Sequence, residues 1–139
     1  ASIPRVNGRP KVNRVEPRKR PRSSMSPTIV TDQDGKLVMA IGSPGGSSII
    51  GYVLKALIAG LDWKMTMQDA IALPNFLNKN RKTELEKGTA LEALAPALRK
   101  LGHQIRIRRK TSGLHGIRVR PGGYEGGADP RREGIARGD

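Results

Sequence analysis

The spacing of apolar residues predicts a hairpin and a buried helix in the first half of the chain. Between residues 28 and 41, two short β-prone runs flank an Asp-Gly pair at 34–35. Asp-Gly supplies the positive φ that a tight hairpin turn needs. From residue 49 to residue 61, apolar side chains cover most of a helical surface and are interrupted mainly by Lys55. A helix that is apolar nearly all round is predicted to be buried.

Capping signals predict two shorter helices further along. Thr66 and Asp69 match a capping box, and Thr89 and Glu92 match a second one. The apolar spacing after the second box runs across Pro96. Proline does not fit a helix interior, so either this helix kinks at Pro96 or its regular part starts there.

The last third of the chain reads as short strands and turns. Residues 104–108 alternate strictly between polar and apolar side chains, as a half-buried strand does, and residues 114–119 form a second β-prone run. Gly-Gly pairs at 122–123 and 126–127 predict turns on either side of Tyr124. Because short helices and strands are interspersed, the sequence predicts an α+β fold.

Composition and charge give further information about the class of protein. Of the 139 residues, 36% are hydrophobic and only 3% are aromatic. These values fit a piece that completes its core with other residues, and they also fit a partly disordered basic protein. The chain begins at Ala1, and we expect it to be processed, truncated or excerpted. Its net charge of +14 favours anionic partners, and the absence of cysteine excludes disulfides and thiol catalysis.

Residues 1–22 differ from the rest of the chain. They contain eight basic residues, four prolines and a single acidic residue, Glu16. Because proline disfavours a helix, the segment predicts an extended basic arm, with a solvated linker as the alternative. We therefore divide the chain into an arm at 1–22 and a folded portion at 23–139.

Gly45 and Gly46 lie between a predicted strand and the predicted buried helix. Backbone N–H groups at a helix start lack intrahelical partners, and glycine lets a substrate approach them closely. The chemistry that fits best is an oxyanion hole, in which N–H donors stabilise charge developing on a carbonyl oxygen. The alternative is an ordinary strand-to-helix turn. A P-loop is excluded by the missing lysine.

Other polar residues give weaker signals. Ser23, Ser24 and Ser26 gather hydroxyls just before the first strand, where they can bind a carboxylate or simply cap a turn. His103 and His115 have no second metal ligand at useful spacing, so we assign both to structure and predict no metal site and no cofactor.

The acidic residues give no convincing pair of catalytic carboxylates. Residues 129–132 (DPRR) predict a surface turn with adjacent opposite charges. The alternative is that Asp129 holds an arginine, which then anchors a loop or binds a carboxylate through bidentate hydrogen bonds.

Taken in order, three of these stretches resemble the gamma-glutamyltransferases. Residues 20–30 (RPRSSMSPTIV) are similar to the family's RPLSSMSPTIV, and residues 42–47 (GSPGGS) are similar to its GSPGGS. Residues 128–131 (ADPR) are similar to its near-terminal motif. The resemblance runs from about residue 13 to residue 139 and corresponds to the C-terminal part of the family's small catalytic subunit.

The resemblance implies an N-terminal-nucleophile hydrolase with an αββα sandwich, made as a precursor that cleaves itself. In such an enzyme a threonine attacks the gamma-glutamyl amide of glutathione or a related donor, and the acyl group passes to water, an amino acid or a peptide. Ser23 and Ser24 match the serines that bind the donor's α-carboxylate, and Gly45 and Gly46 match the oxyanion-hole glycines. The implied partner is the large subunit of the same precursor, and the implied location is periplasmic or extracellular.

The chain also departs from the family's pattern. The nucleophilic threonine of the family lies upstream of the serine motif, whereas Thr28 lies inside it. We therefore expect no nucleophile in this chain and no activity of the chain alone. Arg18 stands where the family often has Gly, so we expect a strained turn there. Arg22 stands where the family often has Leu, and it places extra positive charge beside Ser23.

Two other interpretations stay open at this point. One is a basic nucleic-acid-binding module, supported by the net charge, the arm and a basic cluster (Arg106, Arg108, Arg109, Lys110, Arg118 and Arg120). Against it, the chain has almost no aromatic platform for bases and no recognisable motif, so we expect no specific nucleic acid. The other is a noncatalytic, degenerate homologue of the family.

Overall fold

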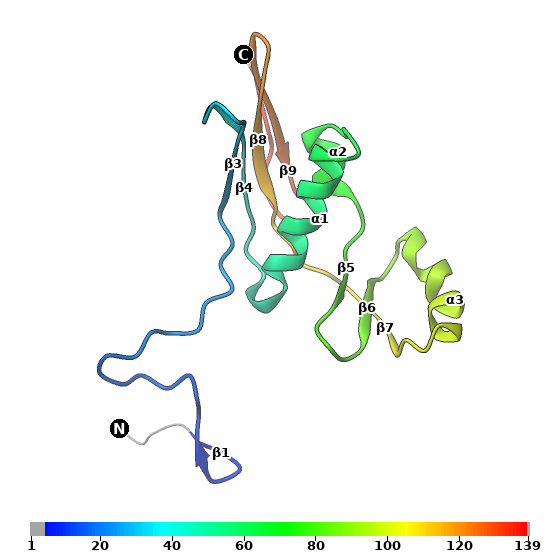
Figure 1. Cartoon of the computed structure of the whole chain (residues 1–139). Coiled ribbons are helices and arrows are strands. Elements are labelled where there is room, and N and C mark those ends of the chain that lie inside the picture. Colours follow the sequence, from blue (N-terminus) through cyan, green and yellow to red (C-terminus); the bar gives the residue numbers. More distant parts are fainter. Residues whose placement is uncertain (1–4, 139) are drawn as a thin grey trace.

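The computed structural model describes residues 5–138 and contains interspersed helices and strands, so the predicted α+β class is confirmed (Figure 1). The elements are β1 (Arg5–Val6), β2 (Arg9–Pro10), β3 (Thr28–Thr31), β4 (Leu37–Gly42), the 3-10 turn η1 (Gly46–Ser48), α1 (Ile49–Leu61), α2 (Met67–Ala72), β5 (Phe76–Asn78), β6 (Thr83–Glu86), the 3-10 turn η2 (Ala90–Leu94), α3 (Ala95–Lys100), β7 (Ile105–Arg108), β8 (His115–Arg120) and β9 (Gly123–Ala128). Each helix of the described part is too short or too polar to cross a membrane.

An antiparallel sheet in the order β3-β4-β8-β9 forms the centre of the molecule (Figure 1). The predicted hairpin is its first half, because β3 pairs with β4. The Asp32 carboxylate organises the turn by accepting hydrogen bonds from the N–H groups of Asp34 at 3.0 Å and Lys36 at 2.9 Å. Gly35 has a φ of 78°, the positive value that the Asp-Gly pair predicted.

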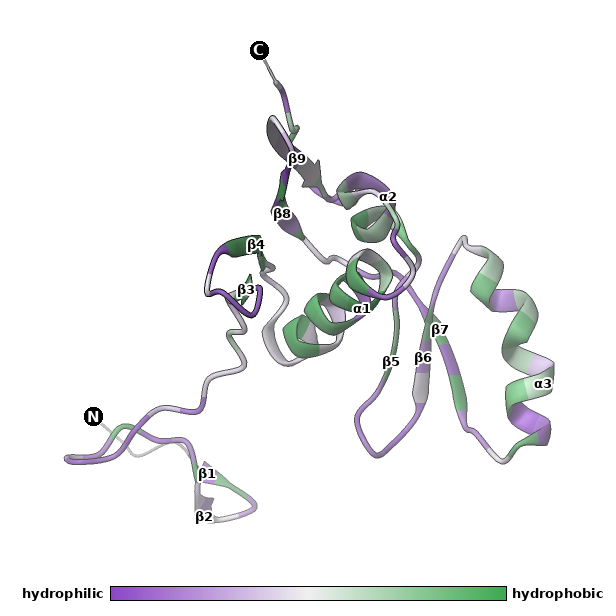
Figure 2. Cartoon of the chain, turned by 45° about the horizontal axis from the view of Figure 1, so that its top comes forward, coloured by the Kyte–Doolittle hydropathy of each residue, from purple (hydrophilic) through white to green (hydrophobic). Residues whose placement is uncertain are grey.

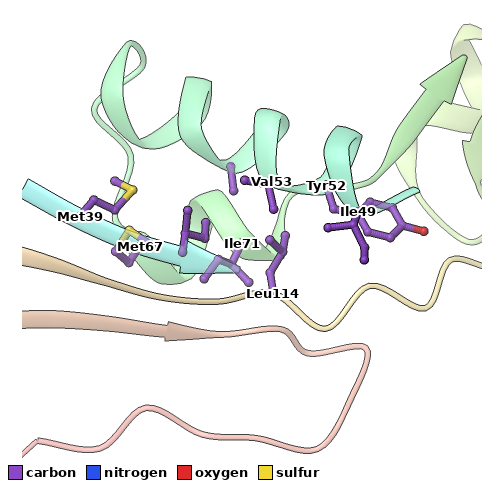
Figure 3. Packing of buried hydrophobic residues seen from close by; sticks show 9 residues of the cluster. Met39, Ile49, Tyr52, Val53, Met67, Ile71 and Leu114 are labelled. Atoms are coloured by element: carbon purple, nitrogen blue, oxygen red, sulfur yellow. The ribbon is translucent and has the colours of Figure 1, made fainter. Parts of the chain in front are cut away.

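Helices α1 and α2 cover one face of this sheet and enclose the apolar core with it (Figure 3). The core residues are Met39, Ile41, Ile49, Tyr52, Val53, Ala56, Met67, Ile71 and Leu114. The predicted capping box at the start of α2 is present. The Thr66 hydroxyl accepts a hydrogen bond from the Asp69 N–H at 3.1 Å and donates to the Asp69 carboxylate at 2.6 Å.

Helix α1 is buried on one side only. Ile50 and Leu54 are 57% and 54% exposed, although apolar colour runs round most of the helix in Figure 2. The predicted burial therefore holds for part of the helix, and the exposed apolar remainder fits a piece that completes its core with other residues. The main sheet, α2 and Leu77 of β5 contact α1, and nothing among residues 5–138 forms a layer over Ile50 and Leu54.

The glycine pair of β9 is part of the strand rather than a turn. Gly126 and Gly127 lie within β9, which pairs with β8, so the predicted turn at this position is wrong. A Cβ on Gly127 would lie 2.8 Å from the carbonyl group of Met67 at the start of α2. Glycine is needed because the helix packs directly on the strand backbone. The turn between β8 and β9 is made at Gly122, whose φ is 83°.

A second sheet, β5-β6-β7, lies between α1 and α3 in Figure 1. Strands β6 and β7 are parallel and are joined through η2 and α3. The second predicted capping box does not form. Thr89 donates to the Glu86 carbonyl at 2.8 Å, while Glu92 accepts from the Gly88 N–H. Pro96 lies in the first turn of α3, so the regular helix starts there. This is one of the two alternatives that the sequence left open.

The described part of the N-terminal segment, residues 5–27, extends away from the main sheet (Figure 1). Residues 1–4 of the predicted arm lie outside the described residues. The Asn13 carboxamide oxygen accepts a hydrogen bond from the Arg22 N–H at 2.6 Å, which folds the segment back just before the serines. Arg18 has a φ of 59°, so the strain expected from an arginine in a glycine position is present.

Candidate active site

The turn from β4 into α1 contains the two glycines that the sequence points to. Gly45 has a φ of 137° and Gly46 a φ of 57°, both in a region that other residues rarely adopt. A Cβ on Gly45 would lie 2.8 Å from the ring of Tyr52, whereas a Cβ on Gly46 would meet nothing within 4 Å. Gly45 therefore packs against the core, and Gly46 faces open space.

The N–H groups of both glycines are unpaired within residues 5–138, where no hydrogen bond has either group as its donor. Their carbonyl groups, in contrast, accept hydrogen bonds from the N–H groups of Ser48 and Ile49 and start the helical winding. Free N–H groups at the start of a 13-residue helix create a local positive potential. Such a position suits negative charge on a ligand.

The two candidate serines lie in the segment that leads into β3. The Ser23 hydroxyl accepts a hydrogen bond from the Met25 N–H at 3.2 Å, which is a local turn contact. The Ser24 side chain makes no hydrogen bond within the described residues, and its carbonyl accepts one from the Ser26 hydroxyl at 3.2 Å. Ser23 is exposed and Ser24 is partly buried. Turn capping thus accounts for the Ser23 hydroxyl but not for that of Ser24.

A surface cleft of about 400 Å³ brings the serines and the glycine turn together. Ser23 and Ser24 line one part of it, and Gly46 and Ser47 line another. Gly45 is not among the lining residues, because it faces Tyr52. The other lining residues are Asn13, Pro21, Arg22, Met25 and Ile49. Three of the four residues singled out from the sequence therefore share one cleft.

The tertiary structure adds residues that sequence reasoning did not find. Asn13 and Ser47 line the cleft. Lys79, from the β5–β6 loop, donates a hydrogen bond to the Ser47 hydroxyl at 2.9 Å. The only signal for Lys79 was its place in a short basic stretch, and a separation of 32 positions from Ser47 hides this contact in the sequence.

Asp129 and Arg131 form a buried ion network behind the site. Asp129 is fully buried, and its carboxylate accepts hydrogen bonds from the Leu114 N–H at 3.1 Å and from the Arg131 guanidinium at 3.0 Å. Arg131 also pairs with Glu86 and donates to two carbonyl oxygens at the C-terminal end of α2. The expected surface turn is therefore wrong, and the alternative of an arginine held by an aspartate is correct. The end of α2 supplies carbonyl groups that need donors.

The environment of Asp129 keeps this carboxylate ionised. Burial by itself raises the pKa of Asp129, but hydrogen bonds from Ser112, Arg131 and Leu114 outweigh that effect and leave the pKa below its ordinary value. The negative charge is thus stabilised by donors from residues 112–114 and from Arg131, and it ties these two segments together.

Lys55 reaches the same region from α1. Its ammonium group donates hydrogen bonds to the carbonyl oxygens of Ile71 at 3.0 Å and Leu73 at 2.7 Å. Burial, together with the positive charge of Arg131, lowers the pKa of Lys55 to about 8. Lys55 therefore crosslinks α1 to the end of α2 without a carboxylate partner.

The remaining titratable candidates make short contacts within the fold. His103 Nδ1 lies 3.0 Å from the Thr83 hydroxyl, and His115 Nδ1 lies 3.2 Å from the Gly113 carbonyl oxygen. Glu84 is held by Lys110. In the part of the chain that the structure describes, no group of His, Asp or Glu side chains could hold a metal ion.

Solved structures place the fold in the class of N-terminal-nucleophile hydrolases. A crystal structure of a Helicobacter pylori gamma-glutamyltranspeptidase mutant matches with a TM-score of 0.78 and 35% identity, over 85% of this chain and 66% of that chain. A crystal structure of an acivicin-inhibited gamma-glutamyltranspeptidase matches with a TM-score of 0.77 and 34% identity, over 86% of this chain and 66% of that chain.

The sequence comparison then gives the family. The family model described as Gamma-glutamyltranspeptidase matches residues 3–138, and the chain belongs to that family. A glutathione hydrolase proenzyme of Escherichia coli (strain K12) is 38% identical over 122 residues, which are 86% of this chain and 21% of the relative. A glutathione hydrolase proenzyme of Bacillus subtilis (strain 168) is 34% identical over 130 residues, 91% of this chain and 22% of the relative. The chain thus spans about a fifth of the length of these relatives.

Proposed function

We propose that this chain forms the donor-binding and oxyanion part of an acyl-transfer site for gamma-glutamyl amides such as glutathione. The observation that carries the proposal is the cleft lined by Ser23, Ser24 and Gly46. A gamma-glutamyl group has a carboxylate at one end and the reacting carbonyl at the other. The cleft offers hydroxyl groups to the first and the free N–H group of Gly46 to the second, with the free N–H group of Gly45 next to it in the chain.

The glycine turn acts on the reacting carbonyl. When a nucleophile attacks this carbon, charge develops on its oxygen, and the Gly45 and Gly46 N–H groups donate to that oxygen. The packing of Gly45 on Tyr52 fixes the turn in advance, so little reorganisation is needed as the charge forms. Removal of one such donor typically lowers kcat by about 10²–10³-fold. The nucleophile, a threonine in the family, is supplied from outside this chain, and we predict that the chain alone is inactive.

Ser23 and Ser24 hold the donor's α-carboxylate by charge-assisted hydrogen bonds. The free hydroxyl of Ser24 supports this role, because nothing within the described residues accepts or donates to it. Arg22 lines the same cleft and adds positive charge next to the carboxylate position. Hydroxyl groups set the orientation, and the guanidinium adds electrostatic attraction.

Large apolar side chains are exposed on the face of the main sheet opposite α1 and α2, which supports a partner layer from the same precursor. Ile29, Ile117 and Tyr124 on the strands are 73%, 52% and 79% exposed. Apolar surface of this kind is typical of an interface. We propose that other segments of the precursor, the large subunit among them, cover exposed apolar surface of this chain. The location outside the cytoplasm stays a prediction from the family resemblance.

The decisive test replaces both serines with alanine in the full-length protein that contains this chain. The double variant loses two hydrogen bonds to a charged group, each worth about 1.5–3 kcal/mol. We expect kcat/KM for gamma-glutamyl anilides to fall by roughly two orders of magnitude or more, since about 1.4 kcal/mol is tenfold. Donors without the α-carboxylate should lose much less.

Two controls separate binding from folding. Self-cleavage of the precursor needs no donor, so the double variant should still process. Ser26→Ala changes a hydroxyl in the same segment that does not line the cleft, and it should have a small effect. The assignment fails if the double variant does not process, or if both donor types lose activity equally.

A further inference from the structure

Five basic residues form a continuous band that starts inside the cleft and leads away from it. Arg22 lines the cleft itself. Lys79 contacts Ser47 at the cleft and also lines a neighbouring cavity of about 460 Å³, so the two cavities adjoin. We call this band the basic track, and its members are Arg22, Lys79, Arg81, Lys82 and Arg106.

The cations of the basic track have no carboxylate partners. Each of the five side chains is exposed, and none forms an ion pair with a residue between 5 and 138. Glu84 lies in the same cavity as Arg106, but it is already paired with Lys110 and Arg108. The β5–β6 loop that carries three of the cations is coloured as hydrophilic in Figure 2. The positive charge of the track is therefore free to attract an anion.

The position of the basic track suits contact with the part of the substrate that lies beyond the γ-carbonyl. The acyl group is first released from one amine and later transferred to a second amine. Both amines occupy the same position relative to the carbonyl carbon. One end of a gamma-glutamyl group lies at Ser23 and Ser24, and its carbonyl lies at Gly46 in the proposed function. The neighbouring cavity adjoins the cleft through Ser47 and Lys79, next to Gly46, and this is the end of the cleft at which the second amine must sit.

We propose that the basic track binds the carboxylates of an acidic peptide that serves as the acyl acceptor. This inference rests on the proposed function and names a substrate class for the same site. The peptide's amine nitrogen forms the new amide bond while the bond from the acyl carbon to the nucleophile's oxygen breaks, and the amine proton passes to that oxygen. The four cations around the second cavity match several carboxylates along a peptide rather than one, while Arg22 stays beside the donor's carboxylate.

The lining of the two cavities favours a peptide over a nucleic acid. Single-stranded nucleic acids are held by cations together with aromatic side chains on which bases stack. None of the residues that line the two cavities is aromatic. The track provides charge without stacking, which suits carboxylates on a flexible backbone.

The test uses the full-length protein and a gamma-glutamyl anilide donor. It compares two acceptors, Glu-Glu-Glu and Gln-Gln-Gln, which have similar shape and different charge. Because the cations are exposed, each contact is modest, and we expect the acidic peptide to be preferred in kcat/KM by about tenfold at low salt. The preference should shrink in 500 mM salt. The triple variant K79A/R81A/K82A should bring the ratio close to one.

A second variant controls for the loss of positive charge elsewhere on the surface. Arg99 and Lys100 are exposed on α3 and have no ion-pair partner among residues 5–138, so R99A/K100A should keep the preference. Equal kcat/KM for the two peptides, or equal loss of preference in both variants, overturns the inference. Tighter binding of a single-stranded oligonucleotide than of Glu-Glu-Glu also overturns it. If no gamma-glutamyl donor turns over, the proposed function fails. The binding of the two labelled peptides is then measured directly, and equal binding rejects the basic track as a site for acidic peptides.

Discussion

The ion network around Asp129 and the basic track around the cleft both concentrate charge, and they arrange it in opposite ways. In the network, Arg131 is bound by Glu86, Asp129 and backbone carbonyl groups. In the track, the one hydrogen-bond partner of Lys79 among residues 5–138 is the Ser47 hydroxyl. Buried charges are tolerated only when they are paired, whereas exposed charges can stay unpaired at small cost. Pairing thus marks the network as structural, whereas the unpaired cations of the track are available to the proposed ligand.

The largest expected effect comes from breaking the network. Arg131→Ala leaves the carboxylates of Glu86 and Asp129 without their guanidinium, and removal of one partner of a buried pair typically costs about 3–5 kcal/mol. We expect the free energy of unfolding, measured by urea denaturation, to fall by that amount. The neighbouring Arg132 is exposed, so Arg132→Ala should change it by less than about 1 kcal/mol. Equal losses in the two variants would contradict a structural role for the network.

A smaller effect separates the two glycines of the cleft. Gly45→Ala forces a Cβ into a φ of 137° and against the Tyr52 ring, so we expect a loss of about 2–4 kcal/mol. Gly46→Ala meets open space and only the cost of a left-handed conformation, about 1–2 kcal/mol. Denaturation of the two variants side by side tests this order. A reversed order would mean that Gly46, rather than Gly45, is fixed by packing.

The smallest effect concerns Lys55, the cation of the network that lacks a carboxylate. Its pKa of about 8 lies below the ordinary 10.5, because the fold disfavours the charged form. Between pH 8 and 10.5 the unfolded chain binds a proton that the folded chain does not, so stability rises with pH in this window. Allowing for solvent screening, we expect a rise of about 1–2 kcal/mol.

The pH dependence has a direct control. Lys55→Met should remove the rise in unfolding free energy, while the same substitution at the exposed Lys100 should keep it. The charges of Arg131, Asp129 and Glu86 also act on Lys55, and Lys55→Met leaves these three residues in place. A rise of the same size in Lys55→Met would assign it to other groups.

Local signals were reliable where a few adjacent residues fix the conformation. The Asp-Gly turn at 34–35, the Thr66 capping box and the start of α3 at Pro96 each depend on contacts within one or two turns of chain. The same reasoning failed at Gly126 and Gly127, which look like a turn but lie in β9. There the need for glycine comes from α2, which is remote in sequence.

The residues of the cleft could be found from the sequence only in part, and their chemical roles stay predictions. Ser23, Ser24 and Gly46 were identified from motif resemblance, and the structure places them at one cleft. Asn13 and Lys79 could not be found in this way, because no local pattern connects a carboxamide in the N-terminal segment or a lysine in the β5–β6 loop to the glycine turn. Asp129 was found but was expected at the surface, since its four-residue motif contains no information about the end of α2.

The sequence by itself determined the family, the α+β class, the hairpin, the helix that follows the glycines, and the residue types able to bind a carboxylate and an oxyanion. These follow from backbone preferences and from motifs that are contiguous in the chain. The tertiary structure alone decided which face of α1 is bare, that Asp129 and Arg131 are buried, and that Ser24, Gly46 and Lys79 meet at one place. The reason is that burial and pairing depend on contacts between distant segments, which form only when the sheet and its helices pack together.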